Sequence, residues 1–147
     1  MSRLPFSPHG SVLVDAEPGM LVVHMHGDWN TEMQTAVARQ MRAYAAGLNA
    51  AGPWGIVNQM HDTLVYAPEI YEKTRASYAH RPAGSRLQAV AFVIASHVEG
   101  ASLLRSRFER LLDGIIPSQV FADLPSARLW MHTQLHTPPH PGTPAPP

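Results

Sequence analysis

The sequence predicts an α/β domain: a mixed, mostly parallel sheet of about five strands with four helices, in the order β-β-α-β-α-β-α-β-α. Short β-branched runs alternate with amphipathic stretches at helical spacing, a pattern typical of strands joined by crossover helices. Glycine and proline fall between these runs and mark where elements end. Residues 87–95 form the most hydrophobic run and indicate a central strand. Residues 54–60 are nearly continuous in apolar character, which suits a strand covered on both faces, as in a parallel sheet.

The first elements are two strands, at 11–16 and 20–25, joined as a hairpin by a turn at Glu17-Pro18-Gly19. A long helix follows Gly27 and should stop before Gly52-Pro53, with Asp28 or Asn30 as its N-cap. Its inward stripe recurs at helical spacing and comprises Met33, Val37, Met41, Tyr44 and Leu48.

Strands and helices then alternate to the end of the domain. The later strands are predicted at 54–60, 87–95 and 118–122. The later helices are predicted from Pro68 to the break at Arg81-Pro82, over 101–113 and over 123–135. Asp123 or Ser126 caps the last helix, and we expect Leu129 and Trp130 to be its buried residues.

Composition narrows the class of protein. Among 147 residues, 11 Lys+Arg balance 11 Asp+Glu, so no global field draws the chain to nucleic acid or an anionic membrane. The absence of cysteine excludes disulfides, thiolate metal sites and a cysteine nucleophile. No apolar run approaches the ~20 residues of a membrane span, and the N-terminus lacks the apolar region of a signal peptide. We therefore expect a cytoplasmic protein with an irregular arm at 1–10, one domain at 11–136 and a proline-rich flexible tail at 137–147.

Element order and two local features carry a family resemblance over about 11–135. The features are the junction Gly27-Asp28-Trp29-Asn30 between strand and helix, and the Pro53-Trp54 start of the following strand. Together they resemble the STAS-like, SpoIIAA-like fold of anti-sigma-factor antagonists, and are closer to its divergent bacterial members than to the sporulation regulators. The resemblance implies a non-enzymatic regulatory module that binds another protein.

In those regulators, a partner kinase phosphorylates the serine of an Asp-Ser pair at the start of the helix after the third strand. Here that stretch reads His61-Asp62-Thr63-Leu64-Val65-Tyr66-Ala67-Pro68. Aligned on the helix start, Ala67 falls near the phosphoacceptor position, and Asp62-Thr63 matches the pair only if the register shifts. We therefore expect reversible docking without the serine phospho-switch.

Polar residues gather where the predicted strands end, and in open parallel sheets ligands bind beyond the carboxyl ends of the strands. From this row we predict the ligand- or partner-binding residues Asp28, Trp29, His61, Asp62, Thr63, Tyr66 and His97. Two structural explanations compete with this reading, because helices need polar caps and Trp29 at a short turn more often covers the core than anchors a ligand.

The histidines raise an alternative function, a metal-dependent enzyme that uses the histidines at the strand ends. His26, His61 and His97 with Asp62 would form a sufficient ligand set, but their spacing matches no zinc motif, so we expect no metal, no cofactor and no catalytic residues. His24 and His26 share one strand face and should be partly buried and hydrogen-bonded. His132 and His136 have a four-residue spacing that can bind metal on a helix.

Two further hypotheses concern partners. A small apolar ligand, such as a lipid chain, could lie between sheet and helices, where adaptable side chains are expected at Met25, Met33, Met41 and Met60. Exposed apolar surface would instead indicate a homodimer, which periodicity alone does not reveal.

Overall fold

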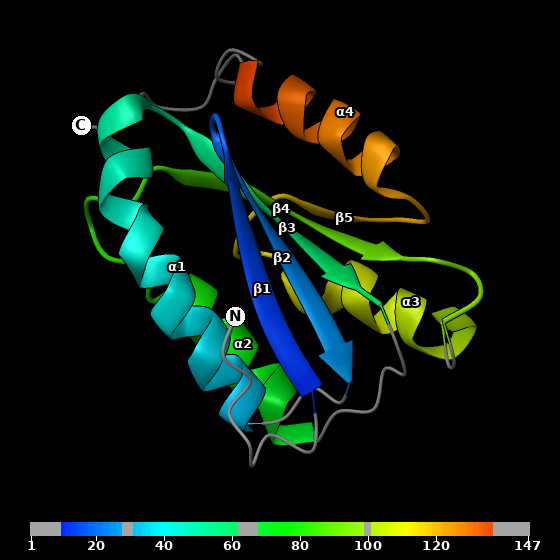
Figure 1. Cartoon of the computed structure of the whole chain (residues 1–147). Helices are drawn as coiled ribbons and strands as arrows, with labels where there is room; N and C mark the ends of the chain where they lie inside the picture. The colour runs from blue at the N-terminus through cyan, green and yellow to red at the C-terminus, as the bar shows by residue number, and fades with distance from the viewer. Residues whose placement is uncertain (1–9, 28–30, 62–67, 99–100, 137–147) are drawn as a thin grey trace.

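The sheet keeps the order of the chain from one edge to the other. The computed structural model describes residues 10–27, 31–61, 68–98 and 101–136, with the side chains of 103 and 104 left aside. Its strands are β1 (Gly10–Glu17), β2 (Met20–Gly27), β3 (Trp54–Met60), β4 (Leu87–Ile94) and β5 (Ser118–Phe121). They lie in the order β1-β2-β3-β4-β5, with β1 antiparallel to β2 and every later pair parallel (Figure 1). The predicted fold class is confirmed.

The helices divide unequally between the two faces of the sheet. They are α1 (Thr31–Ala51), α2 (Pro68–Ala79), α3 (Ala101–Leu111) and α4 (Leu124–His136). Right-handed crossovers that always step to the next strand place their helices on the same side, so α1, α2 and α3 share one face. The last helix, α4, follows β5 and lies on the other face alone (Figure 1).

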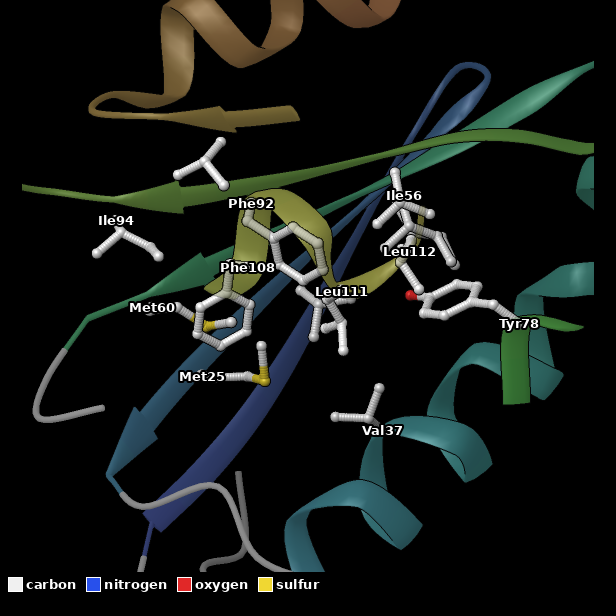
Figure 2. Close-up of a cluster of buried hydrophobic side chains, with 14 of the residues drawn as sticks. Met25, Val37, Ile56, Met60, Tyr78, Phe92, Ile94, Phe108, Leu111 and Leu112 are labelled. Carbon is white, nitrogen blue, oxygen red and sulfur yellow. The ribbon is translucent and has the colours of Figure 1, made fainter. Parts of the chain in front are cut away.

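The larger core lies between the sheet and α1, α2 and α3 (Figure 2). Phe92 of β4 and Phe108 of α3 pack with ring centroids 5.1 Å apart, and both are fully buried. Tyr78 of α2 points into the same cluster. Burial raises the pKa of Tyr78 to about 12, against the lowering influence of the Asn58 side chain and Arg81.

The smaller core lies under α4. Ala127 and Met131 are fully buried against Val57, Ala89 and other small side chains of the sheet. Gly55 makes this approach possible, because a Cβ at that position would stand 2.1 Å from the Met131 sulfur.

Two polar contacts also involve α4 and its first turns. The Ser126 backbone N–H donates to Asp123 Oδ1 at 2.8 Å, which confirms Asp123 as the N-cap and lowers the pKa of its carboxyl. Arg128 Nη2 lies 2.6 Å from Glu17 Oε2, so the same helix is also joined to the β1–β2 hairpin.

The structure corrects three burial predictions. Leu129 is 72% exposed, because the inward stripe of α4 passes through Ala127 and Met131 and leaves Leu129 on the outer face. Trp130 is only partly buried and packs against Phe121, with ring centroids 5.6 Å apart. Tyr44 is exposed on α1, whose buried residues are Met33 and Val37.

Within the described ranges, no helix has the length and apolar character needed to cross a membrane.

Candidate functional site

A polar surface lies on the α4 side of the sheet, beyond the area that α4 covers. The helix packs on β3, β4 and β5, and its core reaches β2 only at Met20 and Val22. A group of neighbouring side chains lies on the same face, toward the carboxyl end of β2. It comes from β1, from β2 and from the residue that follows β3. We call this group the histidine face, and it comprises Leu13, Asp15, His24, His26 and His61.

The hairpin register brings Asp15 to His24. In the antiparallel pair Leu13 lies opposite His24, so Asp15, two residues on, is its diagonal neighbour on the same face. Asp15 Oδ2 lies 3.1 Å from His24 Nε2. The imidazole side chain is 19% exposed and the carboxylate 55%, so the contact lies at the border between the packed sheet and solvent.

The parallel ladder brings His61 to the same place. The His61 backbone N–H donates to the Met25 carbonyl at 2.9 Å, which continues the β2–β3 ladder one residue beyond β3. The His61 ring then stacks on His26, with centroids 4.3 Å apart and planes 5° from parallel. On its other side, His61 Nε2 lies 2.8 Å from His24 Nδ1.

Hydrogen positions follow from the partners in this chain of contacts. A carboxylate only accepts, so His24 Nε2 carries the hydrogen that is shared with Asp15. When His24 is neutral, the lone pair of Nδ1 faces His61, whose Nε2–H donates to it. The arrangement fixes one imidazole by a carboxylate and aligns two ring nitrogens from adjacent strands.

Gln59 adds a buried acceptor beside these rings. It pairs with His24 in the parallel register and lies two residues before His61, so all three share one face. In the part of the chain that the structure describes, Gln59 Oε1 is buried and has no hydrogen-bond partner. Such a group is uncommon in folded proteins and calls for a donor or a cation.

The predicted binding residues separate into three groups. His61 belongs to the histidine face, whereas His97 is exposed in the turn after β4 and is not one of the three stacked rings. The other five lie outside the described residues, namely Asp28, Trp29, Asp62, Thr63 and Tyr66. Across the ranges that are described, no group of three or more His, Cys, Asp or Glu is placed to hold a metal.

The strand order also bears on the strand-end prediction. The ligand crevice of open α/β sheets forms where strand order reverses, and the order β1-β2-β3-β4-β5 contains no reversal.

Sequence reasoning placed His24 and His26 on one face and expected them to be partly buried and hydrogen-bonded. This holds for His24, whereas His26 is exposed. It missed Asp15 and Gln59. The two-residue hairpin turn was the available signal, since it sets the register that carries Asp15 to His24.

The methionines proposed for an apolar ligand belong to the larger core. Met25, Met33 and Met60 are buried among its residues, and Met41 packs against them. An open hollow of about 480 Å³ lies elsewhere, at the loop that leads from α3 to β5, and is lined by residues 113–118.

Comparisons with known proteins agree with the observed fold. A solved structure of an anti-sigma factor antagonist from Mycobacterium paratuberculosis superposes with a TM-score of 0.50 and 13% sequence identity. The match covers 84% of this chain and 94% of that one, so the two share a fold. No protein-family model matches the sequence. No curated protein matches it either.

Proposed function

We propose that this domain is a non-enzymatic regulatory module that docks reversibly on another protein in the cytoplasm. The shared fold with an anti-sigma factor antagonist supports a protein partner. Because a fold alone does not fix function, the proposal also depends on what the surface of this chain presents.

The observation that carries the proposal is the position of Leu13. It is 46% exposed, although it stands opposite His24 within the histidine face. An apolar side chain surrounded by hydrogen-bonding groups is the usual composition of a contact surface, with a desolvated centre and a polar rim. A partner would cover Leu13 with an apolar side chain and bond to Asp15 and the imidazoles.

The predicted binding residue His61 belongs to the histidine face. We propose that the other predicted residues also contribute to the contact, namely Asp28, Trp29, Asp62, Thr63, Tyr66 and His97. Ala67 has no hydroxyl, so the docking is reversible without a phospho-switch in this stretch. Phosphopeptide mass spectrometry on protein from the host tests this clause, and a modified Thr63 would overturn it.

Site-specific photo-crosslinking in the host tests the docking surface. The photoreactive residue p-benzoylphenylalanine is placed at Leu13 in one variant and at Leu129 in the other. Both leucines are exposed on the α4 side of the sheet, but only Leu13 belongs to the histidine face.

We expect a crosslinked partner of defined mass from the variant at Leu13 and none from the variant at Leu129. The adduct should disappear when Asp15→Arg is added, since a long cation would stand where the partner docks. Equal adducts from both positions, or none from either, would refute the proposal that a partner docks on the histidine face. An adduct with a second copy of this chain would replace the regulatory proposal with a homodimer.

A further inference from the structure

The two facing imidazole nitrogens are positioned by the sheet rather than by flexible loops. His24 lies within β2, and the His61 backbone is hydrogen-bonded to Met25 of the same strand. Their ring nitrogens, Nδ1 of His24 and Nε2 of His61, are 2.8 Å apart. The stack on His26 holds the His61 ring in a single plane.

Asp15 contacts the ring nitrogen of His24 that does not face His61, as a carboxylate does in many metal sites with histidine ligands. Histidines that ligate metals almost always donate the other ring N–H to a carboxylate or carbonyl, which fixes the tautomer and strengthens the ligand. His24 meets this description, with Nε2 held by Asp15 and Nδ1 directed at the second imidazole.

The buried oxygen of Gln59 is a second, independent observation that indicates a ligand. It lies in register with His24, it shares a face with His61, and among the described residues it has no hydrogen-bond partner. An amide oxygen can ligate a divalent ion or accept a hydrogen bond from a water bound to that ion.

We infer that His24 Nδ1 and His61 Nε2 bind a divalent ion of the zinc class, with Gln59 Oε1 as the oxygen donor and Asp15 orienting His24. Two nitrogens that bind a tetrahedral zinc ion at ordinary distances are about 3.4 Å apart. The two ring nitrogens must therefore move apart by about 0.6 Å when the ion binds. The His61 proton moves from Nε2 to Nδ1 through solvent, and no net proton is released.

This donor set defines the kind of site. Two imidazoles favour zinc and its neighbours over magnesium and calcium, which prefer oxygen ligands. With fewer than three strong protein ligands the ion exchanges, unlike a closed structural zinc centre. The inference does not require the docking proposal, because it is tested on the purified protein alone.

A competing pair must be removed before the test. His132 and His136 stack at the end of α4 with centroids 5.1 Å apart, and a four-residue helical spacing binds metal by itself. The parent protein for the experiment is therefore the full chain with His132→Ala and His136→Ala. Zinc affinity is measured by competition with a chromophoric chelator, with magnesium as the comparison ion.

We expect one zinc ion per parent chain and no competition by magnesium. His24→Ala and His61→Ala should each weaken zinc binding by about 100-fold or more, and Asp15→Asn by about 10- to 100-fold. His80→Ala and His97→Ala are the matched controls, since both histidines are exposed and lie outside the histidine face. Zinc binding that survives His61→Ala, or a parent that binds no zinc, would overturn the inference.

A spectroscopic readout guards against variants that fail to fold. Imidazole nitrogen resonances of the parent, recorded with and without zinc, should shift at His24 Nδ1 and His61 Nε2, while His24 Nε2 keeps its hydrogen. Bound zinc that leaves these two resonances unchanged would refute the assignment of the ligands.

Discussion

Replacing Gly55 with alanine tests the packing that sets how much of the sheet α4 covers. The new Cβ would stand 2.1 Å from the Met131 sulfur, 2.7 Å from its Cε and 3.1 Å from its Cγ. Met131 is fully buried, so its side chain must shift among packed neighbours. The added methyl therefore has to displace α4 from β3 or force Met131 out of its rotamer.

Overpacking of this kind costs about 1–3 kcal/mol of unfolding free energy. For a chain of this size the midpoint of thermal unfolding should fall by about 3–10 °C. Met131→Ala alone should cost about 2–5 kcal/mol through lost burial and a cavity. In the double variant the alanine methyl occupies part of that cavity, so the loss should be smaller than the sum by at least about 1 kcal/mol.

Urea unfolding followed by circular dichroism measures all three variants. Gly47→Ala is the matched control, because a Cβ there meets nothing within 4 Å. It lies inside α1, so it should stabilise the protein by about 0.5–1 kcal/mol. Additive losses in the double variant, or a Gly55→Ala variant as stable as the parent, would refute the packing of Met131 on Gly55.

Two further predictions concern polar groups, the buried Tyr78 and the partly buried Asn49. Burial raises the pKa of Tyr78 from its ordinary value of 10.0 to about 12, so the neutral form stabilises the fold below pH 10. About 3 kcal/mol should be lost as the pH rises from 10 toward 12. In urea unfolding at pH 8–11.5, the free energy of unfolding of Tyr78→Phe should fall less with pH than that of the parent. Parallel plots of this free energy against pH for the two proteins would contradict the prediction. Asn49 Oδ1 accepts from Trp54 Nε1 at 2.6 Å and from the Arg86 backbone N–H at 2.8 Å. Asn49→Ala should therefore cost about 1–3 kcal/mol in the same assay, and a loss below about 0.5 kcal/mol would show that water replaces both bonds.

The fold was predictable because local signals agreed with one another. Residues 54–60 were predicted as a strand and form β3 with the same bounds, since the apolar run follows Gly52-Pro53 and ends at a polar loop. The face of α4 was not predictable in the same way. Its sequence contains several apolar stripes, and side-chain size favours Leu129 and Trp130 as the buried residues. The small Ala127 is the residue that fits against the sheet.

The candidate site was predictable only within single strands. Alternation along β2 placed His24 and His26 on one face, but which residues face them depends on strand neighbours and register. Asp15 is nine residues from His24 in the chain and His61 is thirty-seven, so neither contact leaves a local spacing signal. Hairpin geometry could have supplied the first contact, whereas the second required the sheet itself.

The one-sided arrangement of the helices has a consequence for synthesis on the ribosome. The face that holds Val57, Ala89, Ala91 and Val93 receives its cover from α4, which is the last described element to leave the exit tunnel. Until Leu124–His136 emerges, the nascent sheet presents that strip of small apolar side chains to other chains and to chaperones. A ribosome stalled before Leu124 would thus hold a half-covered sheet, and release of the final helix ends that exposure.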